Sequence, residues 1–284
     1  MKSRAVGTQG IVQPAETARL RTVDERAGSL QVLVAESEAE IEAAYALRYK
    51  VFYEEMHANA VGDVAARKRD FDAFDPYCDH LLVLDNDLGG GAEAVVGTYR
   101  LLRRDGAARA GRFYSADEYD ISKLVAYDGE ILELGRSCVD ARYRTRATMQ
   151  IMWRGIAAYV MAYKIDIMFG CASLHGTDPR AMAAPLAYLH HNRLAPTEIR
   201  PVALPERYVD MNLLPPDRID TRAALKDLPP MIKGYLRLGG FVGEGAVIDH
   251  EFNTVDVCVV VQTDLVTEKY FKHYTRNMSN GQES

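Results

Sequence analysis

One segment, residues 130–153, joins a charged strand to a basic turn and then to a helix. The strand is apolar but carries Glu133 and Arg136. The turn contains no acidic residue and three arginines: Arg142, Arg144 and Arg146. A charge inside a buried strand is costly unless it has a partner or a task. The start of a helix beside arginines suits a phosphate, because its N–H groups are free. The segment therefore predicts an enzyme that holds a phosphate-bearing donor beside a carboxylate.

The elements that position these residues follow from hydrophobic periodicity. We expect strands at residues 29–36, 80–86, 94–103, 131–139, 165–173, 246–250 and 255–262. We expect helices at residues 39–56, 148–163, 179–191 and 229–238. The early strands follow one another directly, which favours antiparallel pairing, and the later strand–helix–strand step favours parallel pairing. The sequence therefore predicts an α/β fold (an α+β mixed sheet), with a central mixed sheet flanked by helices.

This fold is expected to occupy one domain at residues 29–275. Residues 1–28 are polar and aperiodic, so we expect a disordered N-terminal tail. Residues 276–284 are expected to form a flexible C-terminal tail.

Composition argues against several classes of function. The 284-residue chain carries a net charge of −6, which gives no global sign of nucleic-acid binding. Residues 97–112 nevertheless hold five arginines and one aspartate, which suits a small anionic ligand or an acidic partner. No run reaches the ~18 apolar residues of a membrane span, and residues 1–28 lack the apolar core of a secretory signal.

The four cysteines are too far apart for a metal knuckle, so we expect no metal site. Cys138, Cys171 and Cys258 stand in apolar runs and are expected to be buried thiols. A reduced, cytoplasmic setting fits this usage.

Four short motifs occur in the first half of the chain. They are LRYKVFYEEM with Arg48 and Phe52, FDAFD with Asp72 and Asp75, VGTYRLLR with Arg100, and ELGRSCV with Glu133 and Arg136. In this order they resemble the GCN5-related (GNAT-type) acyltransferases, and more narrowly the group of acyl-homoserine-lactone synthases and L-ornithine Nα-acyltransferases. FGCASLHGTDP at residues 169–179 and the stretch at residues 229–261 favour the ornithine branch. The resemblance covers residues 30–275 and implies a GNAT-like acyltransferase fold.

Two positions depart from the patterns of these groups. Homoserine-lactone synthases carry a tryptophan six positions after the phenylalanine that Phe52 matches, and this chain has Ala58 there. The GNAT turn signature (Gln/Arg)-x-x-Gly-x-(Gly/Ala) runs from Arg142 to Ala147 with Thr145 in place of the central glycine. The first departure favours an amino acid acceptor over S-adenosylmethionine. The second favours a carrier-protein donor, whose phosphopantetheine arm has one phosphate.

Aminolysis of a thioester needs a base, and Glu133 is the best candidate because desolvation in an apolar strand raises the pKa of a carboxyl. Arg136 lies three residues on, which places it on the opposite face of an ideal strand unless a β-bulge intervenes. The alternative is a structural Glu133–Arg136 pair. Such a bulge would expose an oxyanion donor, either a backbone N–H at residues 137–139 or the hydroxyl of Ser137. Cys138 is expected to be a buried thiol rather than a nucleophile.

The resemblance also implies a set of substrate contacts. Asp72 and Asp75 would hold the cationic end of ornithine, Arg100 its carboxylate, and Arg48 would pair with the two aspartates. Phe52 is placed in the same substrate-binding set. The donor phosphate would lie against five residues of the turn: Arg142, Arg144, Thr145, Arg146 and Ala147. Local alternatives are an Asx turn for the aspartates and a solvated turn for the arginines.

The leading hypothesis is transfer of a 3-hydroxyacyl chain from acyl carrier protein to the α-amine of L-ornithine, which gives lyso-ornithine lipid. No cofactor is expected beyond the phosphopantetheine arm of the donor. Peripheral contact with the inner membrane through the lipid product is left open. One alternative keeps the chemistry and changes the acceptor to glycine, lysine or homoserine lactone. The other is a non-catalytic module that binds acyl carrier protein.

Overall fold

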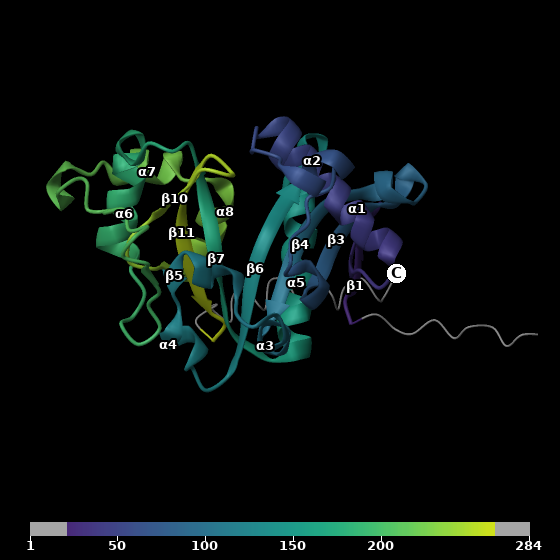
Figure 1. The fold of residues 1–284 in the computed structure, drawn as a ribbon, viewed down its shortest axis with the longest axis horizontal. Coiled ribbons are helices and arrows are strands. Elements are labelled where there is room, and N and C mark those ends of the chain that lie inside the picture. Colours follow the sequence, from purple (N-terminus) through teal and green to yellow (C-terminus); the bar gives the residue numbers. More distant parts are fainter. Residues whose placement is uncertain (1–21, 265–284) are drawn as a thin grey trace, which may run out of the picture.

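The computed structural model describes residues 22–264, which form a nine-stranded mixed sheet and a small two-stranded sheet (Figure 1). The large sheet has the order β1-β2-β3-β4-β6-β7-β11-β10, with β9 beside β11. Its strands are β1 (Asp24–Ala27), β2 (Leu30–Val34), β3 (Asp79–Asp85), β4 (Val95–Arg103), β6 (Glu130–Val139), β7 (Ile165–His175), β9 (Phe241–Val242), β10 (Val247–Asp249) and β11 (Thr254–Gln262). The small sheet pairs β5 (Tyr119–Asp120) with β8 (Val202–Ala203).

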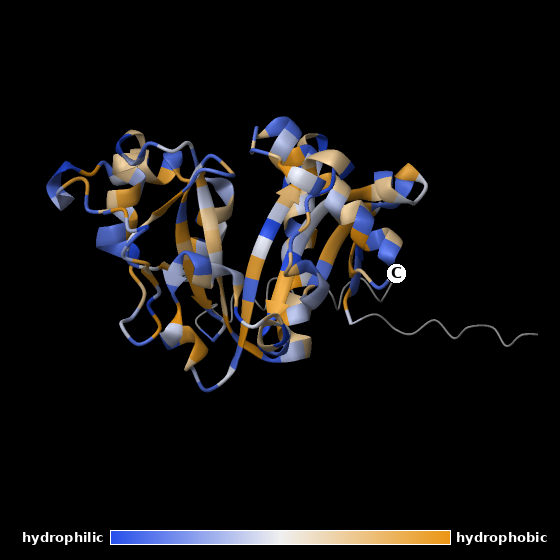
Figure 2. Ribbon diagram, viewed as in Figure 1, coloured by the Kyte–Doolittle hydropathy of each residue, from blue (hydrophilic) through white to orange (hydrophobic). Residues whose placement is uncertain are grey.

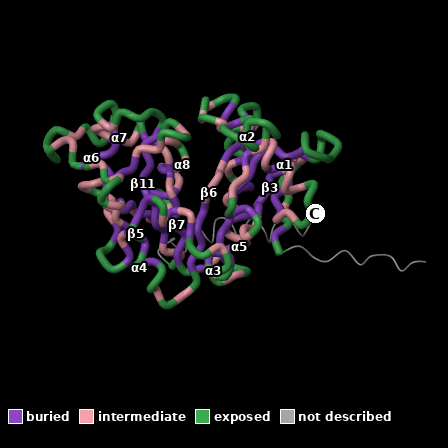
Figure 3. The backbone as a smooth tube through the Cα atoms, viewed as in Figure 1, coloured by how far each residue is buried: buried purple, intermediate pink, exposed green. Residues whose placement is uncertain are grey.

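Helices cover both faces of the large sheet. They are α1 (Glu38–Tyr49), α2 (Gly62–Arg67), α3 (Arg104–Ala110), α4 (Ser122–Val125), α5 (Arg146–Tyr163), α6 (Ala183–Arg193), α7 (Thr221–Asp227) and α8 (Pro230–Arg237). Ser37 and Glu40 start α1 with a capping box, and α1 passes directly into a π-helix at Lys50–Glu55. The strands are mostly apolar and buried, whereas the outer helices and loops are mostly hydrophilic and exposed (Figures 2 and 3). No helix in residues 22–264 is long and apolar enough to cross a membrane.

The sheet divides at a fork between β6 and β7. These strands pair in parallel only from Glu130 to Glu133, opposite Ile165 to Phe169. Beyond that point β6 stays with β4, and β7 stays with β11 (Figure 1). Gly170 lies at the fork, where a Cβ atom would come within 2.1 Å of the Leu134 carbonyl oxygen. A glycine at this position therefore lets the two strands meet before they separate.

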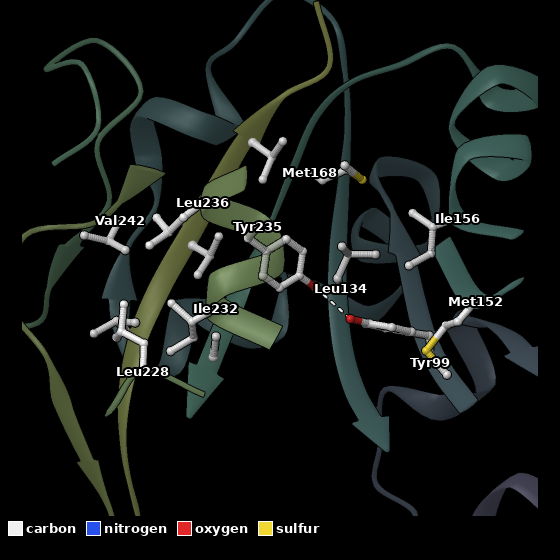
Figure 4. Packing of buried hydrophobic residues seen from close by; sticks show 14 of the residues in the cluster. Tyr99, Leu134, Met152, Ile156, Met168, Leu228, Ile232, Tyr235, Leu236 and Val242 are labelled. Atoms are coloured by element: carbon white, nitrogen blue, oxygen red, sulfur yellow. Dashed lines mark hydrogen bonds between the residues drawn. The ribbon is translucent and has the colours of Figure 1, made fainter. Parts of the chain in front are cut away.

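The two arms of the fork are joined by apolar packing behind it. Tyr99 of β4 and Tyr235 of α8 point toward one another, and their hydroxyl oxygens lie 2.9 Å apart (Figure 4). Leu134 and Met168 flank this contact from β6 and β7, and Ile232 extends the cluster on α8 (Figure 4). α8 thus closes one side of the opening between the arms.

The predicted fold class is confirmed, including the antiparallel early strands and the parallel step from β6 to β7. The prediction of a disordered tail at residues 1–28 is wrong at its end, because residues 24–27 pair with β2 as a strand. Residues 1–21 and 276–284 lie outside the described part of the chain. Cys138 and Cys258 are buried as expected, whereas Cys171 is only partly buried. Sequence periodicity missed α2, α3, α4 and α7, which are helices of four to seven residues.

Candidate active site

A cavity of about 540 Å³ lies in the fork between β6 and β7. Residues 133–139 of β6 line one side, and residues 168–173 of β7 line the other. α8 and the π-helix contribute apolar residues, and the segment at residues 114–118 contributes Tyr114, Ser115 and Glu118. The volume lies in the ~300–1,000 Å³ range of small-molecule sites. The fork therefore provides a site that contacts both arms of the sheet.

A β-bulge in β6 turns two neighbouring residues toward this cavity. Thr98 pairs with Cys138 and Arg100 pairs with Gly135, so Arg136 and Ser137 together face Tyr99 alone. Arg136 has a φ of +49°, which is uncommon for a residue with a side chain. The bulge brings Glu133 and Arg136 to one cavity, as the sequence required for a shared site. Ser137 also lines the cavity.

Glu133 has backbone partners rather than the guanidinium of Arg136. Its carboxylate accepts the N–H of Tyr114 at 2.8 Å and the N–H of Ser115 at 2.6 Å. Burial raises the pKa of Glu133 above its ordinary value, while these N–H groups and Arg100 act in the opposite direction. Each carboxylate oxygen keeps a further acceptor direction. The group is therefore a fixed carboxylate of raised basicity at the wall of the cavity.

The open edge of β6 presents a free backbone group beyond the bulge. The N–H of Asp140 donates to Val96 on the β4 side, and N–H groups alternate along a strand. Val139 therefore faces the other way, and its carbonyl accepts a hydrogen bond from Arg144 Nε at 3.1 Å instead of from a strand. Its N–H points toward the cavity that it lines. The predicted oxyanion donor at residues 137–139 stays a prediction with this N–H as its best candidate.

The basic turn lies at the start of α5, beside the cavity. Thr145 is the N-cap residue, and its hydroxyl accepts the N–H of Thr148 at 3.2 Å. The N–H groups of Arg146 and Ala147 lie in the first turn, where no intrahelical acceptor exists. Arg144 lines the cavity and forms an ion pair with Glu55. Arg142 instead pairs with Asp140 at 3.0 Å, outside the cavity lining.

An arginine–aspartate cluster lies behind one wall of the cavity. Arg48 contacts Asp70 at 2.5 Å and Asp75 at 2.7 Å, and it is fully buried. The other pairs are Arg100 with Asp72 at 2.7 Å, Arg100 with Asp75 at 3.4 Å, Arg136 with Asp70 at 3.3 Å, and Arg136 with Asp72 at 3.2 Å. Three guanidinium groups thus meet three carboxylates. Although burial raises the pKa of Asp75, Arg48 and Arg100 hold that pKa below its ordinary value.

These contacts argue against the role predicted for Asp72 and Asp75. Neither is among the described residues that line the cavity, and Asp75 is 3% exposed. Both carboxylates are already bound by arginines, and contact with a substrate ammonium stays a prediction. The predicted pairing of Arg48 with this pair is confirmed for Asp75. Asp70, which stands just before FDAFD, was missed as a member of the cluster.

Arg100 and Arg136 present cationic groups to the cavity. Arg136 also lies over the rings of Tyr114 and Phe252, at 5.0 Å and 4.7 Å from their centroids. Phe52 lines the cavity and contacts Phe252 edge to face. Arg100 therefore remains able to meet a substrate carboxylate, with Arg136 beside it.

Comparison with known proteins supports an acyltransferase. Residues 47–154 match the model of the acetyltransferase (GNAT) domain. An L-ornithine Nα-acyltransferase of Agrobacterium fabrum is 50% identical over 88% of this chain and 86% of its own. Proteins of the same name from Rhizobium meliloti and Rhodobacter capsulatus are 48% and 45% identical over 88% of this chain, and over 85% and 96% of theirs. The chain belongs to the L-ornithine Nα-acyltransferase family. It is an acyltransferase with a GNAT-like fold.

The sequence motifs did not indicate one group of acidic residues at the cavity. Glu118, Asp249 and Asp256 all line it, and Glu118 is far along the chain from the other two, which lie on the paired strands β10 and β11. The one signal in the sequence was Asp256, which stands in the apolar run TVDVCVVV. A charge in such a strand requires a partner or a task. Asp249 lies with Asp256 in the stretch at residues 229–261, which indicated the family but not an acidic site, and Glu118 belongs to no motif.

Proposed function

We propose that the protein transfers a 3-hydroxyacyl chain from acyl carrier protein to the α-amine of L-ornithine, which forms lyso-ornithine lipid. The observation that carries this proposal is the cavity at the fork. It contains a fixed carboxylate, the open edge of β6 and an apolar wall. The names of the family relatives support ornithine as the acceptor.

Glu133 is the base of the proposed reaction. The α-amine of ornithine is mostly protonated at neutral pH and must lose a proton before or during attack. The nitrogen then bonds to the thioester carbonyl carbon, the C–S bond breaks, and the pantetheine thiol leaves. The N–H of Val139 faces the oxyanion of the tetrahedral intermediate. Arg100, with Arg136 beside it, meets the carboxylate of the amino acid.

The donor lies along β6 and α5 in this proposal. The cavity wall formed by Met149, Met168, Met231 and Tyr235 suits a long acyl chain, because flexible methionines adapt to apolar ligands. The phosphate of the phosphopantetheine arm lies against the N–H groups of Arg146 and Ala147, with Arg144 beside it. No other cofactor is needed. The acidic carrier protein docks on the exposed arginines of the turn, and the lipid product brings peripheral contact with the inner membrane.

The test is a direct assay of donor and acceptor. The purified protein is incubated with a 3-hydroxyacyl carrier protein and, separately, with ornithine, lysine, glycine or S-adenosylmethionine, and products are identified by mass. We expect an acylated ornithine, and a lower rate when acyl-CoA replaces the carrier protein. An acyl-homoserine lactone at a comparable rate, or binding of the carrier protein with no product from any acceptor, would contradict the proposal.

A further inference from the structure

Three carboxyl groups gather at one end of the cavity. Glu118 follows the turn at Tyr114–Asp117, Asp249 ends β10, and Asp256 lies in β11. One oxygen from each lies within 4.8 Å of the others. Glu118 and Asp256 are 4% and 6% exposed. The carboxyl groups are therefore crowded and largely removed from water.

These carboxyl groups have few partners. The nearest cation to Glu118 is Arg207, whose Nη2 lies 3.6 Å from one oxygen of the carboxylate. The N–H groups of Glu251 and Phe252 donate to one oxygen of Asp249. Within residues 22–264, Oε2 of Glu118 and Oδ1 of Asp256 are buried and accept no hydrogen bond. Unpaired buried acceptors of this kind are uncommon in proteins and call for a physical explanation.

Little positive charge balances the three carboxyl groups. Burial and the neighbouring Glu118 raise the pKa of Asp256 to about 7, although hydrogen bonding with Thr254 and Ser173 acts in the opposite direction. Burial also raises the pKa of Glu118, although Arg207 opposes that change. A cation bound among these oxygens would favour their charged forms.

The acidic group lies on the same face of the sheet as the proposed base. Asp256 pairs with Ser173, Cys258 with Cys171 and Val260 with Phe169, and Phe169 is the partner of Glu133. Alternate residues of a strand share a face, so Asp256 and Glu133 both face this side of the cavity.

Ser115 connects the two sites over a short distance. Its N–H donates to Glu133 at 2.6 Å, and its carbonyl accepts the N–H of Glu118 at 3.1 Å. One small ligand can therefore contact both Glu133 and the acidic group.

From this placement we propose that Glu118, Asp249 and Asp256 bind the side-chain ammonium of the acceptor amino acid. This inference rests on the proposed function and names the residues that select a diamino acid. The α-amine lies at Glu133, the carboxylate at Arg100, and the terminal ammonium among the three carboxylates. An ammonium group donates three hydrogen bonds, which matches the unpaired oxygens of Glu118 and Asp256.

Norvaline tests this assignment without any mutation, because it has the carbon chain of ornithine and no terminal amine. With wild-type protein we expect kcat/KM for norvaline to be ~10–100-fold lower than for ornithine, the value of hydrogen bonds to a charged group. Asp256→Asn and Glu118→Gln should each remove most of this difference by lowering kcat/KM for ornithine. Turnover of norvaline should change less than turnover of ornithine, so the ornithine-to-norvaline ratio of kcat/KM should fall toward one in both variants.

Asp217→Asn, an exposed aspartate outside the cavity, is the matched control and should leave the ornithine-to-norvaline ratio unchanged. Thermal unfolding followed by circular dichroism shows whether each variant is folded. If one variant fails to fold, the other variant and the wild-type substrate series still decide.

The outcomes separate this inference from the proposed function. If ornithine and norvaline are acylated equally by wild-type protein, the acyltransfer stands and the ammonium site is wrong. If no amino acid is acylated, the proposed function fails, and calorimetry with ornithine and norvaline then tests the site alone. A divalent cation is the competing ligand for three carboxylates. Loss of ornithine turnover in EDTA, restored by Mg²⁺ or Mn²⁺, would overturn the ammonium assignment.

Discussion

Two groups of charged side chains adjoin the cavity, and they differ in how their charges are balanced. The first has three arginines and three aspartates, joined by contacts of 2.5–3.4 Å around Arg48. The second has three carboxyl groups and one arginine at 3.6 Å. Both are largely buried. The first therefore satisfies its charges within the protein, whereas the second leaves carboxylate oxygens without partners.

This contrast separates a structural use of charge from a binding use. A buried carboxylate held by arginines already has its charge balanced, so motif residues such as Asp75 position the arginines that face the cavity. A buried carboxylate without a partner destabilises the folded state. Such a cost is typical of functional sites, where activity and stability conflict.

The largest expected effect is on the balanced group. Arg48→Met should lower the free energy of unfolding by ~3–5 kcal/mol, because it leaves Asp70 and Asp75 buried without their main cation. Urea unfolding followed by circular dichroism measures this. Arg67→Gln is the control, since the pair of Arg67 with Glu42 is exposed and should change stability by less than ~1 kcal/mol. Similar losses in both variants would remove the distinction between the two groups.

Glu133 lies between the groups and belongs to neither. Glu133→Gln should lower kcat by ~10²–10⁴-fold at pH 7, the usual contribution of a general base. The loss should shrink as pH rises above the pKa of the α-amine, ~8, because free amine then arrives without help.

The same variant should also lose some stability. Glutamine would turn an NH₂ group toward the N–H of Tyr114 or Ser115, which costs ~1–3 kcal/mol. Steady-state rates from pH 6 to 9, together with urea unfolding, separate the two effects. A kcat near that of wild type at pH 7 would make Glu133 a structural residue.

The contrast between the groups also explains what the sequence could predict. The seven strands expected from apolar runs are all present, whereas the short strands β1, β5, β8 and β9 were missed. A bulge was an open alternative in the sequence, and the structure has it at Arg136 and Ser137. The sequence singled out the aspartates of FDAFD but not their contacts with Arg100 and Arg136, because a sequence shows a charge and does not show its partner. Asp249 and Asp256 meet through the pairing of β10 with β11, and the turn after Ser115 brings Glu118 to them. No sequence motif connects Glu118 with the other two.

For the group of Glu118, Asp249 and Asp256, removal of a charge should stabilise the folded protein, whereas removal of Arg48 should destabilise it. Asp256 has a pKa of about 7 in the folded state, above its ordinary value of ~4 in an unfolded chain. The folded state therefore binds more protons between these values, and stability falls as pH rises from ~4 to ~7. Asp256→Asn removes this penalty and should raise the free energy of unfolding at pH 8 by ~2–4 kcal/mol. At pH 5 the gain should be small.

Urea unfolding of ligand-free protein at the two pH values tests this sign. Asp217→Asn serves again as the control and should change stability by less than ~0.5 kcal/mol at both. Destabilisation of Asp256→Asn at pH 8 would show that the charged carboxylate has a partner in the folded protein, and it would end the contrast with Asp75.

The smallest expected effect is that of substituting an exposed arginine of the basic turn. Arg146 is exposed in the first turn of α5, where its backbone N–H is proposed to face the donor phosphate and its side chain an acidic carrier protein. Arg146→Glu should raise KM for the acyl carrier protein about fivefold, since a single exposed charge contributes ~1 kcal/mol. KM for ornithine should not change, because its terminal ammonium is proposed to bind Glu118, Asp249 and Asp256 instead. Exposed charges are screened over ~8 Å at physiological ionic strength, so the effect should shrink as salt rises from low to 0.5 M. A donor KM that ignores both the substitution and the salt would place the carrier protein elsewhere on the surface.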